Sequence, residues 1–263
     1  MKKYLSSLAI SAFLVTAANA GAVIDVEVGG GSWSTDAPTG TVDTTLGVFD
    51  LQDEAKLGST SDNTYVWAVI DHPVPIVPNV RIEQVTLKSS GTNSYTVGAF
   101  TGSVDSELDL SNTDFILYWG VPFATWAPFI DELDIGIGVK SFSGGILMEE
   151  TLTGNSLIDE SFSGGMVPYA YGKLRIEPPF MMGIGIEGEI KHISYDAGSV
   201  EATFNETIIK ADWGYLFPLP ILDIEPGIEF GYREMSIDID SSDITTDVGF
   251  KGLFFGAYAK FGI

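Results

Sequence analysis

Leu253-Phe-Phe-Gly-Ala-Tyr-Ala-Lys-Phe-Gly-Ile263 is the stretch that decides the fold class. When it is read with a period of two, positions 253, 255, 257, 259, 261 and 263 form a wholly apolar face of a strand. The opposite face carries small or amphipathic residues and one phenyl ring, that of Phe254. A tilted strand of about 9–11 residues spans the hydrocarbon layer of a bilayer. Because so long and apolar an edge strand would promote aggregation in water, the stretch predicts a membrane-barrel strand.

The amino-terminal segment has the pattern of a secretory signal peptide. Lys2 and Lys3 precede an apolar stretch from Leu5 to Val15, and Ala18-Asn19-Ala20 fits a small-x-small cleavage site. We expect residues 1–20 to be removed, which leaves 21–263 as one domain. The alternative, a short membrane anchor, is disfavoured because about 11 apolar residues are too few to span a bilayer. The absence of cysteine excludes a disulfide scaffold, a thiolate metal site and lipidation of a new amino-terminal cysteine.

The remaining sequence repeats the strand period along its whole length. The full chain has 45% hydrophobic residues and 30 glycines, and the part after the signal peptide has no further long apolar run. Only helices and closed barrels satisfy every backbone group inside lipid. The fold prediction is therefore an all-β, transmembrane, antiparallel up-and-down β-barrel of about ten strands, within a range of eight to twelve. The clearest alternating segments are 22–29, 133–140, 170–177, 180–191, 209–217, 222–233 and 253–263, and the weaker ones are 64–72, 79–88 and 108–119.

The connections between these segments alternate between long and short, as in outer-membrane barrels with long extracellular loops and short periplasmic turns. Within 79–88 the apolar parity slips after Ile82, which predicts a bulge. The prolines mostly fall where strands should end; Pro168 and Pro226, inside predicted strands, mark a bulge or a misplaced boundary. The expected long loops are 31–63, 89–107, 143–165, 196–205 and 240–245, and the expected short turns are 73–78, 120–130, 178–179 and 217–221.

Charge and tryptophan placement add to this interpretation. The formal net charge of −23 argues against nucleic-acid binding, which requires basic stripes. We interpret the acidic loops as solvated surface. The alternative is that divalent cations bridge these loops to lipopolysaccharide phosphates, although no loop has the spacing of a defined calcium site.

As a group, the tryptophans fall near predicted strand ends, which favours interfacial belts: Trp33, Trp67, Trp119, Trp126 and Trp213.

Three segments resemble a known family. They are Asp71-His-Pro-Val-Pro-Ile-Val-Pro-Asn-Val80, Asp109-Leu-Ser-Asn-Thr-Asp114, and 227–237 with its Gly-Tyr-Arg-Glu-Met-Ser sequence. They are similar to those of a family of small outer-membrane β-barrel proteins of Gram-negative bacteria, named for a Gly-Gly pair, here Gly29-Gly30. The resemblance implies a barrel in the cell outer membrane, and it implies no catalytic residue. We expect the barrel to contact outer-membrane lipid and lipopolysaccharide. We also expect the C-terminal strand to engage the barrel-assembly machinery.

The predicted inner face carries charges of both signs. Because a barrel of about ten strands has a narrow lumen, we expect paired side chains to fill it and the protein to have a structural or envelope role. The alternative is a narrow, porin-like pore for ions or small solutes. The candidate lumen-lining residues are Lys140, Lys173, Arg175, Glu187, Glu189, Lys191, Lys210, Asp212, Glu229, Arg233 and Lys260.

An enzymatic alternative rests on His192, Ser194 and Glu206. Some outer-membrane lipid A deacylases, which are acyl hydrolases, use a histidine base and a serine nucleophile on the lipid-facing wall. Strand parity places His192 and Ser194 outward but Glu206 inward, so we expect no such activity. His72 is expected to cap a proline-rich turn. With two histidines, no cysteine and no nucleotide-binding or nucleophile-elbow motif, we expect no enzyme, metal or cofactor.

Overall fold

The computed structural model describes residues 24–44, 47–74, 76–97, 100–122, 129–161, 166–178, 183–196, 200–218, 222–241 and 245–262. The regular elements in these ranges are β-strands. No helix within the described ranges is long and apolar enough to cross a membrane. The predicted signal peptide and Trp126 lie outside the described residues.

Ten antiparallel strands form a closed barrel, which confirms the predicted fold class. Each barrel strand pairs with the next along the chain, and β1 closes the sheet by pairing with β17 from Asp25↔Gly262 to Thr35↔Gly252. The ten strands are β1 (Asp25–Thr35), β4 (Thr60–Asp71), β5 (Asn79–Thr86), β8 (Asn112–Gly120), β9 (Ile130–Phe142), β12 (Met166–Ile176), β13 (Ile184–Asp196), β14 (Val200–Gly214), β16 (Asp223–Ser241) and β17 (Thr245–Gly262).

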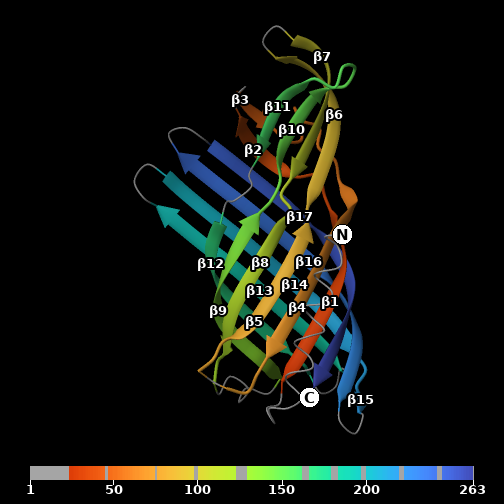
Figure 1. Cartoon of the computed structure of the whole chain (residues 1–263), viewed down its shortest axis with the longest axis vertical. Coiled ribbons are helices and arrows are strands. Elements are labelled where there is room, and N and C mark those ends of the chain that lie inside the picture. Colours follow the sequence, from red (N-terminus) through yellow and green to blue (C-terminus); the bar gives the residue numbers. More distant parts are fainter. Residues whose placement is uncertain are drawn as a thin grey trace, which may run out of the picture.

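The two ends of the barrel differ (Figure 1). One end, here called the turn end, holds the first residues of β1, the last residues of β17 and the connections from β4 to β5, β8 to β9, β12 to β13 and β14 to β16. The other, the loop end, carries the hairpin of β2 (Thr39–Thr44) and β3 (Gly47–Asp50) beside β17. Above it lies a four-stranded sheet of β6 (Lys88–Val97), β7 (Phe100–Asp109), β10 (Gly145–Glu150) and β11 (Ser156–Ser161). A short strand, β15 (Phe217–Pro218), pairs with β16.

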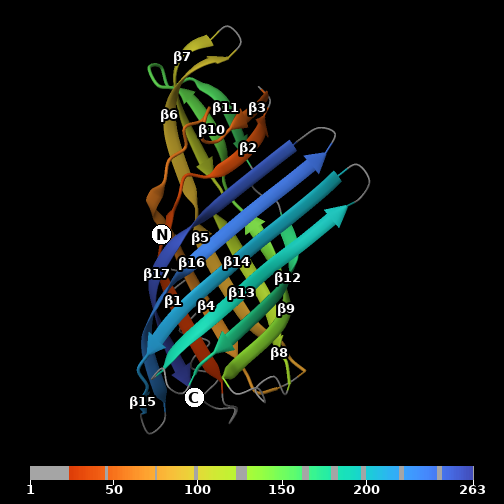
Figure 2. The same ribbon diagram turned by 180° about the vertical axis from the view of Figure 1, so that it is seen from behind.

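The three longest predicted loops therefore contain strands of their own, and two further predicted loops are wrong in their extent. The described residues within 196–205 and 240–245 belong to β13, β14, β16 and β17, and the register of β14 on β16 runs unbroken from Val200↔Ser241 to Gly214↔Gly227. Their polar composition indicated loops, yet polar residues are compatible with a strand that rises into water. Figure 2 shows these four strands extending away from the barrel toward the loop end.

The bulge predicted in 79–88 is absent from β5, whose register with β4 and β8 shows no shift. Arg81 and Glu83 are buried, and Val85 and Leu87 are buried on the same face. The same alternate residues therefore face inward along the whole segment. What changes toward the loop end is the barrel interior, which passes from charged to apolar. Pro168 and Pro226 also sit in regular register, opposite Val139 and Ala259, so neither marks a bulge.

An apolar core fills the loop end of the barrel. It is one continuous cluster that joins the upper barrel wall to the β2–β3 segment and the four-stranded sheet. Burying each large aliphatic or aromatic side chain contributes about 1.5–3 kcal/mol, so this core is a major stabilising element. Its most deeply buried members are Trp33, Leu51, Leu87, Leu108, Ile116, Ile146, Phe204, Met235 and Phe250.

The outer wall of the barrel is apolar. Large hydrophobic side chains from β4 to β17 are exposed there, among them Ile137, which is 60% exposed. The predicted aromatic belt is wrong for two tryptophans, because Trp33 lies in the apolar core and Trp67 is buried inside the barrel. The exposed wall residues include Val66, Ile82, Phe115, Ile135, Ile137, Leu174, Ile190, Ile209, Trp213, Ile228, Phe230, Tyr232, Leu253 and Phe255.

Glycines on the inner wall make room for aromatic rings of neighbouring strands. A Cβ at Gly138 would lie 2.4 Å from the Tyr169 ring, and a Cβ at Gly227 would lie 2.2 Å from the Tyr258 ring. In the same way, a Cβ at Gly29 would lie 2.5 Å from the Trp67 ring. These rings cover the glycine backbone and narrow the lumen.

Replacing Gly138 by valine should therefore destabilise the barrel by about 1–3 kcal/mol, because the Tyr169 ring must leave its place in the interior. The matched control is Gly188→Val, since a Cβ at Gly188 has no atom within 4 Å. The urea midpoint of the barrel in detergent micelles, followed by tryptophan fluorescence, measures both. Equal midpoints for the two variants would contradict the packing role of Gly138.

Candidate functional site

The candidate site is the barrel interior, which has a charged middle and a small open chamber at the turn end. All eleven candidate residues from the sequence lie on the inner wall: Lys140 and Lys191 in the middle, Glu189, Glu229 and Arg233 close by, and Lys173, Arg175, Glu187, Lys210, Asp212 and Lys260 around the chamber. The alternating pattern of the strands therefore brings all of them into one lumen.

Two lysines and two carboxylates form the centre of the charged middle. The Lys140 ammonium lies 2.6 Å from a carboxylate oxygen of Asp114 and 2.9 Å from one of Glu206. The Lys191 ammonium lies 2.8 Å from the same Asp114 oxygen and 3.3 Å from Glu206. All four side chains are fully buried. Each charge thus faces two opposite charges, an arrangement that offsets the large cost of removing ions from water.

Two arginines extend this centre across the lumen. Arg233 lies 2.5 Å from Glu83 and also pairs with Glu206. Arg81 lies 3.1 Å from Glu83 and 2.8 Å from Glu189. Two of these pairs cross the lumen: Arg81–Glu189 joins β5 to β13, and Arg233–Glu83 joins β16 to β5. Neither pair of strands is adjacent in the sheet, so the side chains meet across the barrel.

We call the complete set the ionic cluster. Its members carry four positive and four negative charges at neutral pH, and each is at least 90% buried. Tyrosine hydroxyls complete it: Tyr169 donates to Asp114 at 2.9 Å, and Tyr171 donates to Glu189 at 3.3 Å. Because buried charges must be paired and hydrogen-bonded to be tolerated, the balance is what allows the cluster to fill the lumen. The members are Arg81, Glu83, Asp114, Lys140, Glu189, Lys191, Glu206 and Arg233.

Aromatic rings at the lower boundary of the apolar core lie against the ionic cluster. The Trp33 ring centroid lies 5.0 Å from the Arg233 guanidinium carbon, and the Phe204 centroid lies 5.5 Å from the Lys140 nitrogen. Both rings belong to the apolar core. Cations over ring faces interact favourably, so these rings join the two regions rather than leaving a gap between them.

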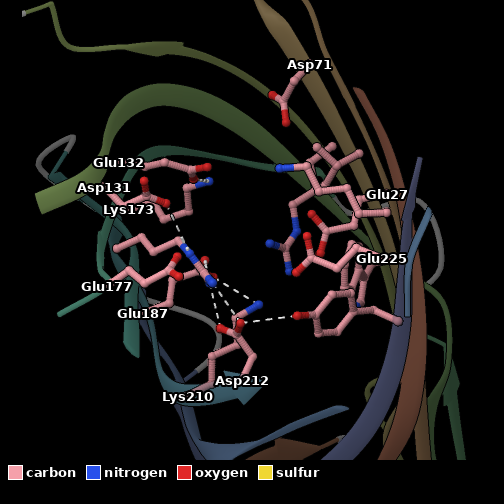
Figure 3. Close-up of a pocket in the computed structure, with 16 residues that line it drawn as sticks. Glu27, Asp71, Asp131, Glu132, Lys173, Glu177, Glu187, Lys210, Asp212 and Glu225 are labelled. Carbon is pink, nitrogen blue, oxygen red and sulfur yellow. Dashed lines mark hydrogen bonds and ion pairs between the residues drawn. The ribbon is translucent and has the colours of Figure 1, made fainter. Parts of the chain in front are cut away.

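The chamber at the turn end, here called the vestibule, has a volume of about 120 Å³ (Figure 3). Arg175 holds Asp212 with two hydrogen bonds of 2.6 and 2.7 Å, and Lys173 lies 2.6 Å from Glu132. Figure 3 shows Glu27 and Glu225 on the side of the vestibule opposite Lys173. Such a volume accommodates a few water molecules between the charged walls.

Between vestibule and ionic cluster lies a smaller set of contacts around Glu229. The Tyr65 hydroxyl donates to its carboxylate at 2.7 Å, and the Trp67 indole N–H donates at 3.3 Å. Lys210 lies 3.3 Å from the same carboxylate and 3.0 Å from Glu187. The inner aromatics therefore serve as hydrogen-bond donors to the lumenal acids as well as packing over glycines.

The sequence pattern left out three central residues, Arg81, Glu83 and Asp114. They lie on β5 and β8, whose strand patterns were the weakest, and their charges were not assigned to a face. A weaker signal was present, because each charged residue has a large apolar neighbour on at least one side. Arg81 lies between Val80 and Ile82, while Glu83 follows Ile82 and Asp114 precedes Phe115. In a barrel wall, such an isolated charge can only face the interior.

The histidines lie where the sequence placed them. His192 is exposed on the outer wall, with its Nδ1 2.6 Å from the Asn205 side-chain oxygen, whereas Glu206 is buried inside among lysines and an arginine. The barrel wall thus separates Glu206 from His192 and Ser194. His72 caps the turn before β5, as predicted: its Nδ1 accepts from the Val74 N–H at 3.2 Å and its Nε2 lies 3.1 Å from the Pro78 carbonyl oxygen. The described ranges contain no group of three or more His, Asp or Glu side chains placed to hold a metal ion.

Comparisons with known proteins give little beyond this geometry. No protein-family model matches the chain, and no curated protein matches it. A similar solved structure is the β domain of the Bordetella autotransporter BrkA, with a TM-score of 0.31 and 10% sequence identity over 91% of this chain and 98% of that chain. The class of fold, a closed antiparallel barrel of ten strands, is therefore taken from the strand pairings of the chain itself.

Neutralising one member of the ionic cluster should destabilise the barrel strongly. Glu206→Gln leaves Lys140, Lys191 and Arg233 with one negative charge fewer in a buried site, and we expect a loss of about 3–5 kcal/mol in unfolding free energy. Urea titration in lipid vesicles measures it.

The matched control is Glu107→Gln in the sheet above the barrel. Glu107 pairs with Lys88 at 3.0 Å, with both side chains nearly half exposed, so its loss should cost less than about 1 kcal/mol. In this exposed group, hydrogen bonds to Asp109 and Glu107 raise the pKa of the Lys88 ammonium. Similar losses for the two variants would show that burial of the ionic cluster has no energetic consequence.

Proposed function

We propose that the protein is an integral outer-membrane barrel that acts in the envelope as a closed structural element. The observation that carries this proposal is the combination of an apolar outer wall with a lumen bridged by a charge-balanced ionic cluster. On this proposal the turn end faces the periplasm and the loop end faces the exterior, consistent with short periplasmic turns and larger extracellular elements.

Membrane insertion is supported by the inversion of the usual polarity pattern. A barrel of a water-soluble protein would place its charges outside. Here the lysines of β9, β13 and β14 and most of the carboxylates of these strands are buried in the interior, whereas Ile135, Ile137, Ile190 and Ile209 are exposed on the outer wall. A continuous exposed apolar surface of this kind marks contact with lipid or with another protein. We further propose outer-membrane lipid and lipopolysaccharide as the surroundings, and recognition of β17 by the barrel-assembly machinery during insertion.

A closed lumen is supported over the narrow-pore alternative by two consecutive barriers. Ions that enter the vestibule would first meet the ionic cluster, whose charges already have partners, and then the apolar core at the loop end. Displacing paired, buried charges is costly, and an apolar constriction excludes hydrated ions. The elements that remain available for contact with the exterior are the four-stranded sheet and the β2–β3 hairpin.

Lipid contact can be tested with single cysteines, because the chain contains none. A nitroxide at Ile137→Cys, in the middle of the outer wall, should collide more with oxygen than with a water-soluble nickel complex in vesicles, since oxygen concentrates in lipid. A nitroxide at Glu234→Cys, an exposed position of β16 closer to the loop end than Tyr232, should show the reverse. If both labels favour the nickel complex, the outer wall is not in lipid and the proposal fails.

Closure of the lumen predicts that the wild-type protein gives no discrete conductance steps in planar bilayers at any applied voltage. A porin of about sixteen strands, whose lumen is an open aqueous channel, is the positive control in the same bilayers. Insertion is verified in parallel by protease protection of vesicle-reconstituted protein. Reproducible unitary steps from inserted protein would establish the narrow-pore alternative instead.

A further inference from the structure

The outer wall contains a groove at the loop end of the β1–β17 seam. Its volume is about 590 Å³, and its lining includes Ser34, Asp36, Ser59, Ser61, Tyr232 and Leu253. A β-bulge creates it: the register of β1 on β4 shifts between Trp33 and Thr35, so that Thr35 lies opposite Thr60 while Trp33 lies opposite Asn63. The shift leaves an extra residue on β4 between Thr60 and Asn63, which bends this strand where the groove lies.

The groove lies where the outer wall changes from apolar to polar. On β17 the outward residues below it are Leu253 and Phe255, both more than half exposed, and the next outward residue above is Lys251. On β16 the apolar series ends with Tyr232 and is followed by Glu234. For a barrel in a membrane, this is the depth at which lipid headgroups meet acyl chains, and tyrosine is typical there.

The polar groups of the groove are free to bind a ligand. Among the described residues, the hydroxyls of Ser34, Ser59 and Tyr232 and the carboxylate of Asp36 have no hydrogen-bond partner. The backbone of Asp36 is fixed by donation of its N–H to the Lys251 carbonyl oxygen at 2.8 Å, which places the carboxylate at the rim. The groove therefore offers hydroxyls and a carboxylate from a backbone that is held in place.

The charge of the groove lining favours an uncharged lipid headgroup over an anionic one. None of the described residues that line the groove is basic, and Lys251 lies above the lining, so an anionic headgroup inside the groove would meet the Asp36 carboxylate without a counter-charge from the lining. A sugar suits the lining better, because its hydroxyls donate to the carboxylate and exchange hydrogen bonds with serine and threonine hydroxyls, and a tyrosine ring accepts a sugar face by apolar contact.

We propose that this groove binds the sugar headgroup of a glycolipid in the outer leaflet, with the acyl chain lying along Leu253 and Phe255. The inference rests on the proposed membrane location and adds a ligand class and a site to it. A free saccharide lacks the chain, so the apolar wall below the groove would contribute nothing to its binding.

The test is a titration of the isotope-labelled, detergent-refolded full barrel with octyl glucoside, followed by amide chemical shifts. Amides of Ser34, Asp36, Ser59 and Ser61 should shift in a saturable way, while those around Thr113, an exposed hydroxyl residue on β8, should not. Octyl dimethylamine oxide, which has the same chain without the sugar, and methyl glucoside, which has the sugar without the chain, should each leave the groove amides unchanged.

The double variant Ser34→Ala/Asp36→Ala should weaken the apparent affinity at least about fivefold, a difference of about 1 kcal/mol. The matched control, Thr113→Ala, should titrate as wild type. Groove amides that shift no more than those near Thr113, an unchanged affinity in the double variant, or an equal response to methyl glucoside would each overturn the inference. Because the titration is done in micelles, its failure leaves the nitroxide test of membrane location untouched.

Discussion

Closure of the sheet between β1 and β17 is the constraint on which the rest of the structure depends. The register from Asp25↔Gly262 to Thr35↔Gly252 leaves neither of these strands with an open edge along that length. In a hydrocarbon environment an unpaired backbone group costs several kcal/mol, so an open sheet would not be tolerated there. Closure also gives every strand an inner and an outer face. Alternate residues along a strand therefore point either into the lumen or toward the surroundings.

The narrow interior that follows from closure has a composition suited to its size. Glycines lie opposite aromatic rings, and the charged side chains are long enough to reach across to non-adjacent strands, as Arg81 reaches Glu189 and Arg233 reaches Glu83. Individually, each buried ion would be destabilising, but as a set of eight their charges balance one another. The ionic cluster is thus both a consequence of the narrow barrel and the reason that its lumen is filled.

Toward the loop end, the surroundings of the strands change on both the inner and the outer face. Along β5 the inward series runs from Arg81 and Glu83 to Val85, and Leu87 continues it, so the interior passes from ion pairs to an apolar core without a change in backbone register. Along β16 the outward series passes from Phe230 and Tyr232 to Glu234, which marks the emergence of the wall from an apolar to a polar surrounding. The groove at the β1–β4 bulge lies at this second boundary.

Much of this was present in the sequence, because a period of two in residues such as those of 253–263 requires only local stereochemistry. That period predicted the ten-stranded closed barrel and placed Lys140, Lys191 and Glu206 on the inner face. The predicted bulge in 79–88 and the predicted extent of the loops at 196–205 and 240–245 were wrong, because apolar parity and polar composition were interpreted without knowledge of what surrounds each strand. Which side chain meets which across the lumen, as Lys140 meets Glu206, depends on strand order, tilt and register around the closed sheet. These are properties of distant segments brought together, so the ionic cluster, the apolar core and the groove were decided by the tertiary structure alone.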